Sequence, residues 1–334
     1  MADMNITRDS KLIKVLAAQV RNERIDSDKV EESAQICNAL MQNPSPESMH
    51  QIAQTVAFTV DELQKKSLDF LDIVADIKNV GFNEKAAFKT RDYSVKAVIQ
   101  AKGATTPRSY VADHQILVDT EEISARPAIN ILDFLRGSVN MTELIRLSNE
   151  AMTNAKLKKV QKVLHSSIVK FGSPWYAKSS GGEINPNTLN PQLDHFFTFG
   201  DVAILGDFSA VGKLSKLTGM QVNATPTMQY SGNQIDERNR QGYIGSYIGA
   251  SVLRMNNAMD DDGVTPILSR NWLYIVPGGQ SADMRNLKIV NEGNVQSMSA
   301  QDINDRTYEI LLYQFFGVAF VTGKNPTSGC HEIA

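Results

Sequence analysis

Residues 141–171 read MTELIRLSNEAMTNAKLKKVQKVLHSSIVKF and contain neither glycine nor proline. Apolar side chains recur three or four positions apart, as on one face of a helix, at Leu144, Leu147, Leu157, Val160, Leu164, Ile168 and Phe171. Asn140 stands where an N-cap is expected, and Glu143 follows three positions later, as in a capping box. Gly172 and Pro174 supply the stop signal. The stretch predicts one helix roughly 45 Å long, well above the mean for globular proteins.

The second half of this predicted helix is basic. Its lysines are Lys156, Lys158, Lys159 and Lys162. Positive charge toward the C-terminal end of a helix is favourable because it complements the helix dipole. We interpret the run as a solvated helix face, and the alternative is a contact with an acidic partner surface or with nucleic acid.

A strand-like pattern lies upstream, from residue 86 to about residue 119. Apolar and polar residues alternate, turn-forming residues follow at 102–107, and a second apolar run returns at 110–118. The pattern predicts one long hairpin over residues 86–115. An isolated two-stranded hairpin is only marginally stable in water, so we expect this one to lie on a domain or on another subunit. Its basic residues include the candidate subunit contacts Lys89, Arg91, Lys96 and Arg108.

The first 65 residues carry three runs with helical spacing, and a break at residues 43–46 separates the second run from the third. The apolar stripes are narrow and charged residues are frequent. Two interpretations remain open for this segment. It is either a small helical subdomain or an arm, similar to a scaffold, that packs on neighbouring molecules.

The pattern changes beyond the long helix. Residues 173–192 are rich in serine, glycine, asparagine and proline and predict a loop or a boundary. The residues that follow predict a helix at 208–217 and buried strands at 272–277 and 287–290. Further apolar runs lie at 202–206, 307–314 and 315–321. Helices and strands mixed in this way predict an α+β fold with two lobes.

Composition limits the class of protein. The chain has 334 residues, of which 42% are hydrophobic and 21% charged, enough for one large or two ordinary globular domains. The formal net charge of -3 lacks the basic excess of a dedicated nucleic-acid binder. Two cysteines, Cys37 and Cys330, are too few for a disulfide-stapled fold and fit a reducing compartment. We expect no signal peptide, because residues 1–9 have no apolar core. We expect no membrane span, because no window has the ~18–20 apolar residues that a span needs.

The patterns that could indicate an enzyme fail on spacing. Residues 206–213, GDFSAVGK, place five residues between the glycines and Leu214 after the lysine, whereas a phosphate loop needs four and then a hydroxyl residue. Residues 260–262 lack the alternate spacing of a calcium loop, and the five histidines lack metal-ligand spacing. We predict that the protein is not an enzyme and has no cofactor and no metal. A hydrolase site assembled from distant residues such as Asp194 and His195 is the alternative from another class.

The carboxy-terminal half carries a family likeness. Residues 240–252, RQGYIGSYIGASV, resemble a glycine-spaced segment of the major capsid proteins of tailed phages. Residues 272–277 and 305–319 are similar to the closing strands and helix of that family. The order of the upstream elements is similar to that of the Hong Kong 97-type capsid fold. The resemblance spans roughly residues 67–325.

The resemblance implies a Hong Kong 97-like fold with a peripheral domain, an axial domain, a long spine helix, an extended loop and an N-terminal arm. Its implied parts are a helical extension (1–65), an N-arm (66–85), an extended hairpin loop (86–120), a peripheral domain with the spine helix 141–171 (121–194), an axial domain (195–300) and a C-terminal return to the peripheral domain (301–334). In such a family the segment 1–65 is either a scaffold-like region that is removed or an arm that is retained.

The resemblance also implies a function. The chain would be a structural major capsid protein that self-assembles into hexamers and pentamers of an icosahedral phage head around double-stranded DNA, bound non-specifically. The implied partners are further copies of the chain, a portal, a scaffold or protease, and decoration proteins, with no membrane. The implied location is the virion, after assembly in the bacterial host cytoplasm. The alternative within the fold is an encapsulin-type nanocompartment shell, which carries cargo enzymes instead of DNA.

Overall fold

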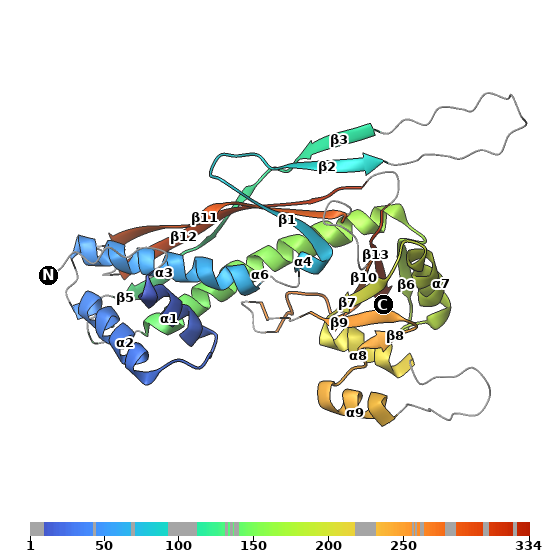
Figure 1. The fold of residues 1–334 in the computed structure, drawn as a ribbon, viewed down its shortest axis with the longest axis horizontal. Helices are drawn as coiled ribbons and strands as arrows, with labels where there is room; N and C mark the ends of the chain where they lie inside the picture. Colours follow the sequence, from blue (N-terminus) through green and yellow to red (C-terminus); the bar gives the residue numbers. More distant parts are fainter. Residues whose placement is uncertain are drawn as a thin grey trace, which may run out of the picture.

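The computed structural model describes residues 10–42, 45–67, 71–92, 112–130, 133, 136, 140–217, 232–255, 257, 259–260, 264–277, 285–302, 307–322 and 326–334. Its central element is α6, which runs over Met141–Ile168 and continues as a short 3-10 helix, η1, over Val169–Phe171. The long helix predicted from the sequence is therefore confirmed. Figure 1 shows α6 crossing the molecule from the N-terminal helices to the lobe that contains the C-terminus.

Local chemistry sets both ends of this helix. The Asn140 side chain accepts a hydrogen bond from the backbone N–H of Thr142, which confirms the predicted N-cap. Gly172 follows η1 with a φ of 65°, a conformation that favours glycine. The predicted capping box is wrong, because the Glu143 carboxylate accepts hydrogen bonds from Arg146 on the next turn.

A five-stranded sheet packs on the first part of α6. Its order is β1 (Ala75–Val80), β11 (Leu287–Asp302), β12 (Thr307–Phe320) and β4 (Glu121–Ala125), and β5 (Ala128–Asn130) also pairs with β12. The pair β11–β12 is long and antiparallel, whereas β1 joins β11 in parallel. Alternate residues of β12 are buried, from Tyr308 to Phe316, so one face of this sheet belongs to the core.

A six-stranded sheet forms the other lobe. Its order is β6 (Tyr176–Ser179), β13 (Gly329–Ile333), β10 (Trp272–Pro277), β7 (Val202–Gly206), β9 (Ala250–Arg254) and β8 (Ser246–Tyr247). The helices α7 (Pro186–Phe197) and α8 (Phe208–Leu217) pack on it, and α9 (Gly232–Gln241) lies beyond α8 in Figure 1. Two sheets with packed helices confirm the α+β class. Each of the ranges 121–194, 195–300 and 301–334 contributes strands to this sheet, and these domain boundaries stay a prediction.

The N-terminal segment folds into the three predicted helices. They are α1 (Lys11–Val20), α2 (Ser27–Gln42) and α3 (Pro46–Ser67), and a short helix, α4, follows over Leu71–Val74. α3 packs against both β11 and α6. Figure 1 shows the three helices gathered at the end of the β11–β12 pair that lies farthest from the second sheet.

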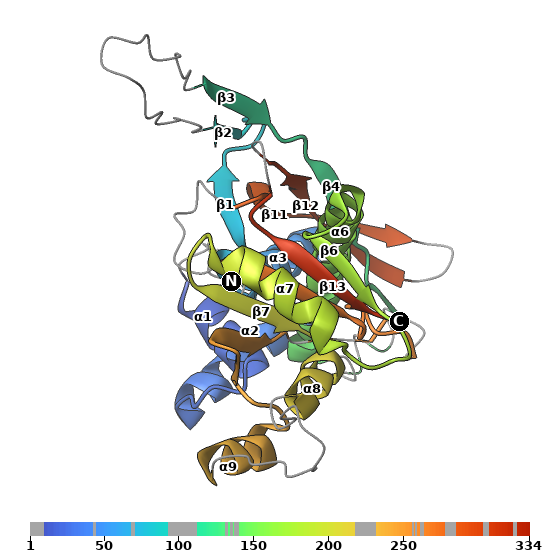
Figure 2. The same cartoon turned by 90° about the vertical axis from the view of Figure 1, so that its right-hand side faces the viewer.

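Both arms of the predicted hairpin are confirmed. β2 (Ala87–Asp92) and β3 (Ala112–Leu117) form an antiparallel pair. Residues 93–111, which include the predicted turn, lie outside the described residues. Figures 1 and 2 both show β2 and β3 beyond the first sheet, at the opposite end of the molecule from α9.

Candidate functional site

The hairpin is held to the body of the molecule at its base. Phe88 of β2 is fully buried, and its core partners are Ala86, Val118 and Val290. The ammonium groups of Lys78 and Lys288 lie 4.6 Å and 5.5 Å from the centre of the Phe88 ring, within cation–π range. The aromatic side chain therefore fixes the direction in which the hairpin leaves the first sheet.

A buried ion pair fixes the strand that leads into the hairpin. Asp76 of β1 and Lys288 of β11 are register partners, and their charged groups meet at 2.9 Å. The two side chains are 8% and 2% exposed. An unpaired charge at such a depth is strongly unfavourable, so each residue depends on the other.

The structure describes only part of the predicted contact set. Lys89 is exposed on β2. Arg91 lies near the end of the same strand, where the backbone alone is described. Lys96 and Arg108 fall outside the described residues. The assignment of these four residues to subunit contacts stays a prediction.

Exposed apolar side chains surround the hairpin base and are absent from the predicted contact set. Phe82, Ile116 and Leu117 are 62%, 36% and 56% exposed. Phe82 packs edge-on against Phe315 of β12, with ring centroids 5.6 Å apart. The sequence pattern predicts a strand at 116–117, but two adjacent apolar residues do not indicate which of them faces solvent.

A cavity of about 300 Å³ lies beside these side chains. Its lining combines two aromatic rings with three carboxylates and one lysine: Phe82, Phe315, Glu84, Asp119, Glu292 and Lys85. Aromatic and acidic groups together suit a basic side chain carried on an apolar segment. We call this cavity the acidic groove.

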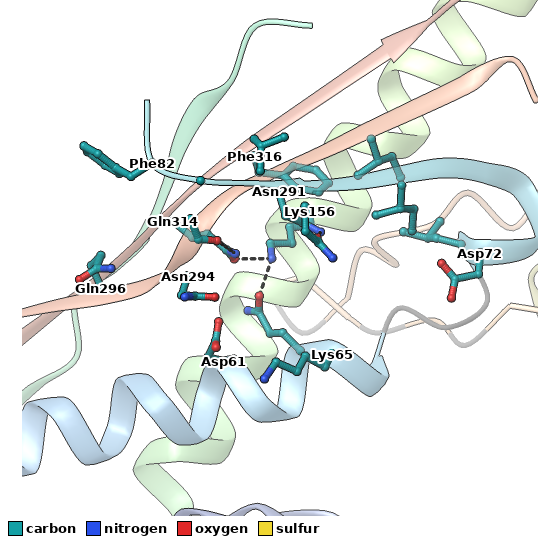
Figure 3. A pocket seen from close by; sticks show the side chains of 18 residues that line it. Asp61, Lys65, Asp72, Phe82, Lys156, Asn291, Asn294, Gln296, Gln314 and Phe316 are labelled. Carbon is teal, nitrogen blue, oxygen red and sulfur yellow. Dashed lines mark hydrogen bonds between the residues drawn. The ribbon is translucent and has the colours of Figure 1, made fainter. Parts of the chain in front are cut away.

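A larger cavity, of about 600 Å³, is lined by residues of α3, α6 and the first sheet (Figure 3). Lys156 of α6 is 2% exposed, and its Nζ donates hydrogen bonds to the side-chain oxygens of Gln64 and Gln314, the latter at 2.6 Å. Burial lowers the pKa of Lys156 to about 8, and the nearby Asp61 carboxylate opposes that effect. Lys156 thus links three elements, α3, α6 and β12.

The basic run on α6 is only partly a solvated face. The interpretation is wrong for Lys156, which lies four positions after Met152 and four before Val160, all three buried on the inward face. The other lysines of the run are partly or fully exposed: Lys158, Lys159 and Lys162.

His195, which the sequence pairs with Asp194 as a candidate hydrolase site, packs among aromatic rings. The His195 ring lies at 5.4–5.7 Å from three aromatic rings, those of Trp175, Phe196 and Phe199. Within the described part of the chain, the Nε2 atom of His195 has no hydrogen-bond partner. Among the described residues, this nitrogen therefore has no nucleophile to activate.

Three other residues form a hydrogen-bonded chain in the order of a catalytic triad. Ser179 Oγ lies 2.7 Å from His331 Nε2, and Gln192 Oε1 lies 3.1 Å from His331 Nδ1. All three are at most 2% exposed, so a substrate cannot reach the hydroxyl. The chain instead joins β6, β13 and α7. Among the residues that the structure describes, no group of metal-binding side chains forms a site, and no helix is long and apolar enough to cross a membrane.

The buried histidine makes stability depend on pH. Burial lowers the pKa of His331 from 6.5 to about 4. Between these values the unfolded chain binds a proton that the folded chain does not, so stability falls as pH decreases from 6.5 toward 4. The full loss is about 3 kcal/mol, at ~1.4 kcal/mol per pKa unit.

Urea unfolding at about pH 7 and pH 4.5 checks this prediction. The wild type and the exposed-site control His50→Gln should lose more stability over this interval than His331→Gln, which lacks the titrating group. Equal losses in all three proteins would contradict it.

The arrangement of two sheets joined by a long helix, with a hairpin projecting from the first sheet, is similar to that of solved chains from phages and a phage-like particle. Solved chains of similar fold come from Gordonia phage Cozz (TM-score 0.52, 10% identity, 80% of this chain and 86% of that chain covered) and from the capsid of a native GTA particle (TM-score 0.52, 12% identity, 80% and 89% covered). A chain from Mycobacterium phage Bobi has a TM-score of 0.50 at 12% identity, with 78% and 89% covered. At these identities the likeness concerns the fold.

The family is defined by sequence. No curated protein matches the chain. Residues 2–329 match the family described as "SPbeta prophage-derived putative capsid protein YonB", and the chain belongs to that family. The resemblance to phage capsid proteins is thereby confirmed, and the role is that of a major capsid protein of a phage head. The family and the fold are those of a structural protein, and they do not favour the nanocompartment or hydrolase alternatives.

Proposed function

We propose that this chain self-assembles into the hexamers and pentamers of an icosahedral head that encloses double-stranded DNA. The observation that carries the proposal is the hairpin, whose described strands project from the body and share a core with it only around Phe88. Such a hairpin gains stability when its outer part lies on another molecule. Closed symmetric contacts between copies turn one such surface into rings and shells.

The chemistry of the hairpin favours a second copy of the chain as that other molecule. Residues 86–115 contain five basic and two acidic residues. The acidic groove at the hairpin base carries three carboxylates and one lysine. Opposite charges steer and orient association. We therefore assign to the contact between copies the residues Lys89, Arg91, Lys96 and Arg108.

The shell assembles in the cytoplasm of a bacterial host. Its partners are a portal, a scaffold or protease, and decoration proteins. The net charge of -3 is compatible with an inner shell surface that encloses DNA without binding it tightly. A protein of this kind binds DNA without sequence specificity.

Electron microscopy of the purified chain, with analysis of nucleic acid in the particles, tests the proposal. Closed shells of uniform size, built from hexamers and pentamers and containing double-stranded DNA when taken from producing cells, are the expected result. A chain that stays monomeric under all conditions would contradict self-assembly. Shells that contain cargo protein and no DNA would favour a nanocompartment.

A further inference from the structure

The N-terminal helices share one hydrophobic core with the rest of the protein. Five inward side chains of α3 are at most 1% exposed: Ile52, Ala53, Val56, Ala57 and Val60. α1 and α2 add further buried side chains: Leu16, Ala17 and Cys37. Helices this well covered are unlike a loosely attached arm, which would leave its apolar stripe to a neighbouring molecule.

The opposite side of that core comes from α6 and the first sheet. Its buried members include Met141, Ile145, Met152, Val295, Tyr308, Ile310 and Leu312. Figure 1 shows α1–α3 around the first half of α6 and the outer end of β11 and β12. Removal of apolar surface from water is the main force that holds a core together, so neither side of this one is complete without the other.

Buried hydrogen bonds cross the same boundary. They run from Tyr308 to Met49, from Val295 to Asp61 and from Lys156 to Gln64. The Lys156 contact is visible in Figure 3, where α3 passes below the ammonium group. Without α3, the buried Tyr308 hydroxyl would lose the Met49 carbonyl that it donates to, and Lys156 would lose one of its two hydrogen bonds, both of which are unfavourable.

We propose that residues 10–67 remain in the subunit of the finished shell as a fixed part of its body, and that they are not a scaffold segment removed during maturation. This inference rests on the proposed function, because it concerns the state of the subunit in the shell. It selects one of the two interpretations that the sequence leaves open. A segment that guides assembly and is then removed would lie outside residues 10–67.

The intact mass of subunits from assembled particles tests the proposal directly. The expected value corresponds to the full chain of 36.9 kDa, or to a chain shortened by no more than its first nine residues. Particles whose subunits begin near residue 68 would overturn the inference. That outcome would leave the proposed shell function intact, because the particles would still have formed.

Hydrogen exchange on the soluble full-length chain gives a second test that needs no particles. Val56→Asp places a charge in the shared core, and roughly 100-fold faster exchange is expected at residues 308–312 of β12. His50→Asp, at an exposed position of the same helix, should leave that exchange unchanged. Val56→Ala provides a milder change, with about tenfold faster exchange expected, should Val56→Asp fail to accumulate.

The hydrogen-exchange result and the shell-formation result test different claims. Wild-type exchange at residues 308–312 in every Val56 variant that accumulates would show that the helices are dispensable for the body of the fold and would overturn the inference. A chain that behaves as expected in exchange but never forms shells would count against the proposed function alone.

Discussion

A subunit in which Asn-Gly replaces residues 93–111 is expected to fold and stay soluble but to form no closed shells. Asp92 and Ala112 are register partners at the ends of β2 and β3, so a two-residue turn can join them without disturbing either strand. The buried core around Phe88 lies on the body side of this turn and is kept. What is lost is the outer part of the hairpin, which we assign to the contact between copies.

Thermal unfolding and electron microscopy together check this prediction. The shortened subunit should unfold within a few degrees of the wild type, because the described core is unchanged. Its particles should be absent, or limited to small open assemblies. Shells of normal shape and size from this variant would refute the role of the hairpin.

Charge substitutions separate the basic residues from the mere length of the hairpin. Glutamine at the predicted contact positions should slow or prevent assembly without unfolding the subunit: Lys89, Arg91, Lys96 and Arg108. A matched control removes the same number of charges at exposed lysines elsewhere: Lys11, Lys14, Lys162 and Lys170. If both variants assemble equally well, the assignment of the four contact residues is wrong.

The parts of the fold that the sequence predicts are those with local signals. The long helix follows from an uninterrupted run, an N-cap at Asn140 and a stop at Gly172, all of which lie on or beside the helix itself. The two arms of the hairpin follow from alternation over a few residues. The candidate contact site between copies could be predicted from the sequence only as a hairpin with basic residues.

The parts that could not be predicted depend on partners far away in the chain. The stripe on α3 shows that one face is buried, but its partners in the shared core, such as Ile310 and Leu312, lie more than 240 positions away. In the sequence, Lys156 resembles a solvated lysine. Only the structure shows that it donates hydrogen bonds to Gln64 and Gln314. Phe82 is exposed two residues beyond the end of β1, and the sequence alone does not show where that strand ends.

Breaking the ion pair between Asp76 and Lys288 is expected to destabilise the fold by about 3–5 kcal/mol. Lys288→Met removes the cation and leaves the Asp76 carboxylate buried without its partner at 2.9 Å. The double variant Asp76→Leu with Lys288→Met removes both charges and should recover most of the loss, because apolar side chains of similar volume avoid the desolvation of two ions. The expected difference between single and double variants therefore measures the burial of a lone charge.

Urea unfolding of the single and double variants provides the measurement. Lys85→Met is the matched control, because Lys85 and Asp119 form a pair whose side chains are 68% and 87% exposed, and its effect should stay within about 0.5 kcal/mol. Lys288 also lies over the Phe88 ring, so the single variant should loosen the base of the hairpin and raise hydrogen exchange in β2 and β3. If Lys288→Met lowers the free energy of unfolding no more than Lys85→Met, the ion pair does not fix β1 against β11. The direction of the hairpin would then depend on the Phe88 core alone.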